Sequence, residues 1–201
     1  MPRETGTGPQ GGILDKSTHG NRKFQMKKKG EVPRDLLNDR GEPTGKTMIR
    51  GEKLRLGQYH LVVHIWVADS KGRLLIQRRA DHLLLMQGVW AVTGGSAVHG
   101  ENSVTAARRE LREELGMDVS PQELTPIGRL RRRNSFSDLW LVRRDVEREN
   151  LVLQKEEVAD ARWVTRDELE QMIREKEFHN YGRPYFDMVF QAVYGSSANE
   201  L

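Results

Sequence analysis

Short runs of apolar residues along the chain predict a series of β-strands. Residues 61–67 read LVVHIWV, a run of strand length that is rich in β-branched and aromatic side chains. A polar tetrapeptide, DSKG at 69–72, predicts a hairpin turn, and residues 74–76 supply the returning strand. Further strands are predicted at 35–37, 89–92, 127–133, 136–142 and 161–164, with a turn at 38–41 that continues through Pro43, Thr44, Gly45 and Lys46.

Three other segments show the spacing of helices. From Asn102 to Leu115 the apolar residues recur every three to four positions, and Gly116 predicts the end of this helix. Thr165 and Glu168 form a predicted capping box for a helix that runs to about residue 175, and a last helix is expected over 184–193. Strands and helices in this mixed order predict an α+β fold, in which helices pack on a mixed β-sheet.

The first 32 residues are rich in glycine, lysine and other polar residues, and they predict a disordered tail before one folded domain at 33–201. The run Lys27, Lys28 and Lys29 suits nucleic acid or acidic lipid, although a solvated tail is the simpler interpretation. The chain carries a formal net charge of +4. This mildly basic balance suits an anionic ligand, either a phosphate compound or RNA, and does not choose between them.

Composition also excludes several classes of protein. The chain has no cysteine, which removes disulfides, thiol nucleophiles and cysteine-ligated zinc. No stretch approaches the roughly 20 apolar residues of a membrane span, and the N-terminus lacks the apolar core of a signal peptide. We therefore expect a cytoplasmic protein that does not contact the membrane.

Acidic residues in the predicted helix at 102–115 are the strongest chemical signal. Glu110, Glu113 and Glu114 are spaced at i, i+3 and i+4, so they share one helix face beside the apolar stripe. Three carboxylates so close repel one another, and a divalent cation such as Mg²⁺, which prefers oxygen ligands, would relieve that repulsion. On helix chemistry alone, an exposed acidic face paired with Arg108, Arg109 and Arg112 is the favoured interpretation.

The spacing of this segment favours the metal site. It fits the pattern G-x5-E-x7-R-E-U-x-E-E-x-G-U, in which U is an aliphatic residue. The matching residues are Gly95, Glu101, Arg109, Glu110, Leu111, Glu113, Glu114, Gly116 and Met117. So many residues at fixed spacing form a far more specific signal than a lone glycine motif. The segment is identified as a Nudix box, and the chain from about Arg34 to Gly195 resembles a Nudix hydrolase domain.

This resemblance implies a Nudix-type α/β/α sandwich with a mixed sheet. It also implies hydrolysis of a diphosphate linkage in a nucleoside diphosphate linked to a group X, with Mg²⁺ or Mn²⁺ as the cofactor. The implied metal ligands are the carbonyl of Gly95 and the side chains of Glu110, Glu113 and Glu114. Arg109 resembles the arginine that orients a glutamate, while Glu101 and Gly116 resemble the structural positions of the motif.

Two further roles are less tightly assigned. The base that takes the proton of the attacking water is expected among the helix glutamates, or at Glu156 or Glu157 in a charged loop before the strand at 161–164. That loop is equally well explained as a solvated surface segment. Arginines on strands could contact the substrate phosphates, although an exposed basic face fits them as well. They are Arg78, Arg129 and Arg131.

Residues 35–79 resemble the Nudix branch that contains isopentenyl-diphosphate isomerase. That resemblance implies a catalytic cysteine near Gly94, which this chain lacks, and a second metal histidine where Ser96 stands. His60 falls at one metal histidine of the isomerase, but structural packing is the favoured role for both His60 and His64. Asp138 stands in the strand where the isomerase uses a glutamate. A hydrolase is therefore the favoured interpretation.

Alternative functions remain open on the sequence. One is a Nudix module that senses a nucleotide without cutting it, and another is an RNA 5′-end pyrophosphohydrolase, suggested by the basic tail and strand arginines. A small-molecule diphosphate is the expected partner. A homodimer is expected by analogy with the family alone.

Overall fold

The computed structural model describes residues 32–83 and 85–195 of the chain. The predicted tail, including its three lysines, lies outside the described residues except for residue 32. The strands are β1 (Arg34–Leu37), β2 (Pro43–Met48), β3 (His60–Ala68), β4 (Leu74–Arg79), β5 (Trp90–Ala91), β6 (Thr93–Ser96), β7 (Thr125–Arg131), β8 (Ser135–Arg143) and β9 (Val158–Val164). The α-helices are α1 (Ser103–Leu115), α2 (Arg166–Arg174) and α3 (Arg183–Tyr194).

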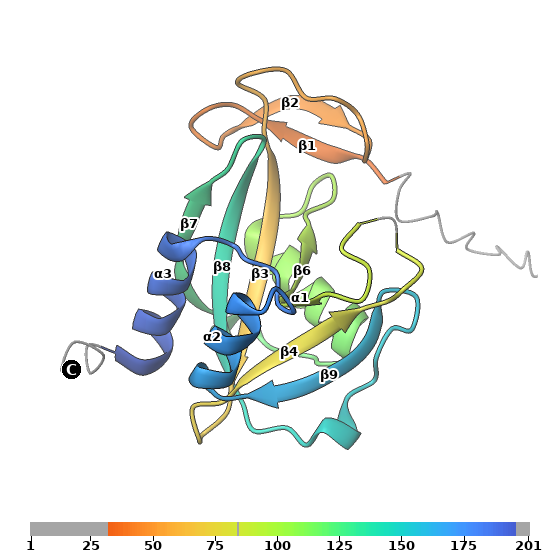
Figure 1. Ribbon diagram of the computed structural model, residues 1–201. Helices are drawn as coiled ribbons and strands as arrows, with labels where there is room; N and C mark the ends of the chain where they lie inside the picture. The colour runs from red at the N-terminus through yellow and green to blue at the C-terminus, as the bar shows by residue number, and fades with distance from the viewer. Residues whose placement is uncertain (1–31, 84, 196–201) are drawn as a thin grey trace, which may run out of the picture.

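A seven-stranded mixed sheet forms the centre of the molecule (Figure 1). Its path is β5-β4-β3-β8-β7, with β6 also paired to β3 and β9 also paired to β4. β3 and β8 run parallel, whereas the other pairs in this sheet are antiparallel. The predicted α+β class and mixed sheet are therefore confirmed.

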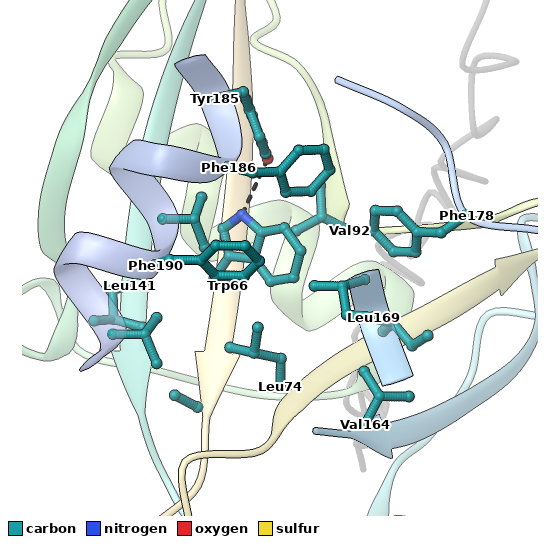
Figure 2. Close-up of a cluster of buried hydrophobic side chains, with 14 of the residues drawn as sticks. Trp66, Leu74, Val92, Leu141, Val164, Leu169, Phe178, Tyr185, Phe186 and Phe190 are labelled. Carbon is teal, nitrogen blue, oxygen red and sulfur yellow. Dashed lines mark hydrogen bonds between the residues drawn. The ribbon is translucent and has the colours of Figure 1, made fainter. Parts of the chain in front are cut away.

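Helices cover both faces of this sheet, which gives the predicted three layers. In Figure 1, α1 lies behind the sheet, and α2 and α3 lie in front of it. Side chains alternate along β3, so Ile65 joins the apolar cluster that contacts α1, while Trp66 joins the cluster that contacts α2 and α3. Figure 2 shows the second cluster, in which the indole nitrogen of Trp66 donates a hydrogen bond to the hydroxyl of Tyr185 at 3.0 Å.

The central strand changes partners along its length. Residues 62–65 of β3 pair with β6, whereas Val67 and Ala68 pair with β4. The change falls at Trp66: beyond this point β4 separates from β3, and its residues Gln77 and Arg78 pair with β5 instead. A side chain of α1 accepts hydrogen bonds from both β4 and β6, so the helix links the two strands.

One sequence-based prediction is wrong. The segment from Pro43 to Lys46 was expected to continue a turn, but it begins β2, which pairs with β1 in a separate two-stranded sheet. The turn is already complete before this point, because the side-chain oxygen of Asn38 accepts hydrogen bonds from the backbone of Arg40 and Glu42. The hairpin joins the main body through a bridge between Leu37 and Tyr59.

The remaining predicted elements agree with the structure to within a few residues at their ends, whereas β6 was not predicted as a strand. The strand expected to reach Arg133 ends at Arg131. Over the described residues, no helix has the length and apolar character needed to span a membrane.

Candidate functional site

Local capping interactions define the helix that carries the three glutamates. Asn102 accepts a hydrogen bond from the backbone of Thr105 at 2.9 Å, which satisfies a donor at the start of α1. Gly116 ends the helix with a left-handed φ of 69°, and a side chain there would press against Val152. These two caps fix which residues of the segment are helical, and thus which way each glutamate points.

Glu114 bridges the two strands that separate beyond Trp66. Its carboxylate oxygen Oε2 accepts a hydrogen bond from the side-chain amide of Gln77 on β4 at 2.8 Å, and one from the backbone N–H of Gly94 on β6 at 3.1 Å. The side chain is 1% exposed. Burial of a charge is expensive unless hydrogen bonds hold it, so both strands cooperate to keep this carboxylate in place.

Glu110 packs directly on the glycine loop. It is fully buried, and a Cβ atom added at Gly95 would lie 2.4 Å from its Oε1 atom. No side chain fits between β6 and this carboxylate, which explains why the position is glycine. The close approach brings Glu110 against the backbone of Gly95.

Arg109 donates hydrogen bonds to several acidic side chains of the site. Its Nη1 atom donates to Glu110 at 2.8 Å and to Glu113 at 3.1 Å. Its Nε and Nη2 atoms donate to Glu101 at 2.8 and 3.0 Å, and Nη2 also donates to the carbonyl of Ser96 at 3.1 Å. Burial alone would lower the pKa of Arg109, but the carboxylates of Glu101 and Glu110 raise it above its usual value.

Arg109 and Glu101 together hold the loop before α1 in place. Glu101 also accepts a hydrogen bond from the backbone of Val98 at 3.0 Å, so the loop before α1 closes on the Arg109–Glu101 pair. The predicted contact from Arg109 to Glu113 is present. Its simultaneous contacts with Glu101 and Ser96 were not predicted from the sequence.

The glutamates fit a divalent cation in the chemistry of their donor atoms. They offer carboxylate oxygens, and two of the three side chains are buried beside the glycine backbone. Across the described residues, no three His, Cys, Asp or Glu side chains are arranged closely enough to hold a metal ion together. Here a guanidinium nitrogen of Arg109 bridges Glu110 and Glu113, and a cation would compete with it for their oxygens.

The loop that carries Glu156 and Glu157 passes the C-terminal end of α1. The backbone N–H of Gln154 donates to the carbonyl of Glu114 at 3.2 Å, and that of Ala80 donates to the carbonyl of Glu157 at 2.9 Å. Glu156 is exposed, and Glu157 is partly buried. The structure thus brings this turn beside the end of the helix that carries Glu114, and the role of these two glutamates as a base stays a prediction.

The three arginines proposed for phosphate contacts already have partners within the protein. Arg78 forms an ion pair with Asp81 at 2.6 Å, and Arg129 contacts Asp138 at 2.8 Å on the neighbouring strand. Arg131 donates to the hydroxyl of Tyr59 at 2.5 Å. Contacts with substrate would require each of them to exchange or share these partners, and their phosphate role stays a prediction.

The two histidines on β3 occupy different surroundings. His64 lies 3.1 Å from the hydroxyl of Tyr185, and burial lowers the pKa of its imidazole to about 3, so it stays neutral at ordinary pH. The Nδ1 atom of His60 is buried and has no hydrogen-bond partner among the described residues. His64 thus takes part in core packing, as expected.

Sequence reasoning missed Gln77 and Gly94, the two partners of Glu114. Gln77 stands in the apolar strand sequence LLIQRR and is 2% exposed. A polar residue directly after three apolar strand residues was the available signal, since a buried polar residue needs a hydrogen-bond partner.

One family model and several known proteins match this chain. The family described as NUDIX domain matches residues 58–186. A Nudix hydrolase of Listeria monocytogenes is 45% identical over 148 residues, covering 73% of this chain and 88% of its own length. An isopentenyl-diphosphate Δ-isomerase of Streptomyces avermitilis is 31% identical, covering 79% of this chain and 85% of its own.

Solved structures show the same fold. The DR0079 protein of Deinococcus radiodurans aligns with a TM-score of 0.65 at 24% identity, covering 81% of this chain and 99% of its own. The MutT protein of Methanosarcina mazei aligns with a TM-score of 0.52 at 20% identity, covering 67% and 94%. Together with the family match and the Listeria relative, these findings establish that the chain belongs to the Nudix hydrolase family and is a hydrolase that acts on phosphoric anhydrides.

Proposed function

We propose that this protein hydrolyses the diphosphate linkage of a nucleoside diphosphate joined to a group X, with Mg²⁺ or Mn²⁺ as its cofactor. The observation that carries this proposal is the pair of buried carboxylates, Glu110 and Glu114, held against the backbone of Gly94 and Gly95. Burying two carboxylates a helical turn apart is costly. A divalent cation would offset this cost and at the same time attract an anionic substrate.

The residues proposed to hold the cation are Glu110, Glu113 and Glu114, together with the carbonyl of Gly95. When bound, a divalent cation neutralises charge on diphosphate oxygens and makes bound water more acidic. The bonds from Arg109 orient Glu110 and Glu113 in the meantime, and the amide donors from β4 and β6 orient Glu114. The chain thus fixes its acidic groups before substrate arrives, which is how a site lowers the cost of reorganisation.

Water attack on phosphorus also needs a proton acceptor. A carboxylate within hydrogen-bond reach of the water is the expected base, and the candidates are the helix glutamates, Glu156 and Glu157. Of the three arginines proposed to bind phosphate, Arg78 forms an ion pair with a well-exposed residue, Asp81, which is 68% exposed. Exposed ion pairs are weak and exchange readily.

A substrate screen with a matched variant tests this proposal. Nucleoside diphosphates linked to sugars, nucleosides or alkyl groups are incubated with Mg²⁺ or Mn²⁺, and released nucleoside monophosphate and phosphate are measured. Glu114→Gln keeps the shape of the side chain and removes its charge, so we expect its turnover to fall at least about 100-fold. Wild-type turnover that does not exceed that of this variant across the panel would refute the proposal.

The screen also separates the alternatives. Tight nucleotide binding by calorimetry, without turnover over hours, would favour a sensing module. Release of diphosphate from triphosphorylated RNA, with binding that weakens steeply as salt rises, would favour RNA 5′-end processing. The proposed small-molecule function predicts neither result. A homodimer and a cytoplasmic location remain proposals that rest on family analogy and composition.

A further inference from the structure

Gln77 carries an unsatisfied polar atom at the centre of the site. Its side chain is 2% exposed, and its amide nitrogen Nε2 donates to Oε2 of Glu114 at 2.8 Å. The carbonyl oxygen Oε1 of the same amide is buried and has no hydrogen-bond partner in the part of the chain that the structure describes. Buried polar atoms are nearly always hydrogen-bonded, so this oxygen calls for a partner outside the protein.

Glu114 determines which way the amide of Gln77 faces. An ionised carboxylate only accepts hydrogen bonds, so the nitrogen of the amide, and not its oxygen, must face it. Covalent geometry then keeps Oε1 about 2.2 Å from Nε2. The unpartnered oxygen therefore lies close to the carboxylate that is proposed to bind the cation.

Fixing Glu114 does not by itself require a carbonyl oxygen at this position. The backbone N–H of Gly94 already donates to the same Oε2 atom at 3.1 Å, so the carboxylate is held from β4 and β6 together. A buried oxygen without a partner opposes folding, and a residue that only filled the strand would be apolar. A glutamine at position 77 is explained if its carbonyl oxygen accepts a hydrogen bond once the cation is bound.

We propose that Gln77 is a positioning residue of the hydrolytic reaction. Its N–H holds Glu114, and its carbonyl oxygen accepts a hydrogen bond from a water molecule that is bound to the cation. Mg²⁺ commonly keeps several of its waters when protein carboxylates bind it, and each such water has hydrogen atoms to donate. This inference rests on the proposed function, because it requires a cation at the three glutamates.

Two substitutions at Gln77 test the inference. Gln77→Met keeps the length of the side chain and removes both amide groups. Gln77→Asn keeps the amide but shortens the reach by one methylene, so it serves where the methionine variant folds poorly. The matched control is Gln171→Met, which removes an exposed amide-to-carboxylate bond of 2.9 Å to Glu175 on α2.

Outer partners of metal ligands usually contribute about 10–100-fold to metal affinity or activity. We therefore expect kcat to fall by about 10–100-fold in both Gln77 variants while KM changes by less than about threefold. Mn²⁺ binding without substrate, measured by electron paramagnetic resonance of the free ion, should weaken by about tenfold. Raising the Mn²⁺ concentration should restore part of the lost activity, whereas a merely structural defect would not respond to the metal.

The readouts distinguish failure of this inference from failure of the proposed function. If the wild type hydrolyses a substrate but both Gln77 variants keep wild-type kcat and Mn²⁺ affinity, only the inference is overturned. If no substrate is turned over, the proposed function fails, and Mn²⁺ binding alone decides the inference: weaker binding in the variants supports it, and unchanged binding overturns it. Gln171→Met should match the wild type in every measurement.

Discussion

Replacing Gly95 with alanine would place a methyl group 2.4 Å from Oε1 of Glu110 and 2.6 Å from its carboxyl carbon. Both distances are shorter than the contacts that Cβ atoms make in proteins, so something must move. The backbone of Gly95 is held by its pairing with Val63 on β3, whereas the carboxylate stands at the end of a side chain that can rotate. We expect Glu110 to turn away and to lose its 2.8 Å bond from Arg109.

The size of the effect follows from two separate costs. Extra volume in a packed interior typically destabilises a protein by about 1–3 kcal/mol. Displacing a catalytic group by about 1 Å can cost on the order of 100-fold in rate. Gly95→Ala should therefore remain folded, with a modestly lower free energy of unfolding, and should lose about 100-fold in kcat/KM.

Gly100 provides a matched control in the same loop. It has a left-handed φ of 82°, and a Cβ added there would meet no atom within 4 Å. Gly100→Ala should therefore cost about 1–2 kcal/mol of backbone strain without moving Glu110. Both variants are compared by urea unfolding and by turnover with saturating Mg²⁺. If Gly95→Ala keeps activity within about threefold of Gly100→Ala, the reasoning about the close approach is wrong.

Two further predictions concern stability. Tyr185→Phe should lower the free energy of unfolding by about 1–3 kcal/mol, because the buried indole N–H of Trp66 loses its acceptor. A urea titration should show a lower unfolding midpoint with an unchanged slope, and an unchanged midpoint would contradict this prediction. Burial would raise the pKa of Asp35, but hydrogen bonds from Gly100 and His99 outweigh it and lower this pKa in the folded state. The ionised Asp35 side chain therefore stabilises the fold above its ordinary pKa of 3.8. This stabilisation is lost as the pH falls through the lowered pKa of the folded state. The wild type should therefore be more stable than Asp35→Asn at neutral pH, and the gap in unfolding free energy should shrink in acid; a gap that stays constant from pH 7 to well below that value would argue against the assignment.

The helix that carries the glutamates could be predicted because its signals are local. Its N-cap Asn102 and its terminal Gly116 each act on neighbouring backbone groups, so sequence alone locates both ends. The contact from Arg109 to Glu113 follows from helical spacing in the same way. The capping box of Thr165 and Glu168 on α2 was predictable for the same reason.

The partners of Glu114 could not be predicted, because they depend on contacts between distant parts of the chain. Gln77 is 37 residues away in sequence, and Gly94 is 20 residues away. They meet Glu114 only because β3 changes its partner strand at Trp66. No local pattern specifies that change, and the segment TGGS that forms β6 was not predicted as a strand. The error at Pro43 has a different origin: turn-forming residues continued past the end of the turn, and pairing with β1 outweighed their weak strand preference.

The loop that leads into α1 is held from two sides, and this links the N-terminal hairpin to the site. From within, Arg109 and the backbone of Val98 bind Glu101. From outside, Asp35 on β1 accepts a hydrogen bond from the backbone of Gly100 at 2.9 Å. The family match begins only at residue 58, so β1 lies outside it and yet contacts the loop of the Nudix box. The positions of Glu101 and Arg109, and through Arg109 that of Glu110, therefore depend in part on β1, which the family match does not include.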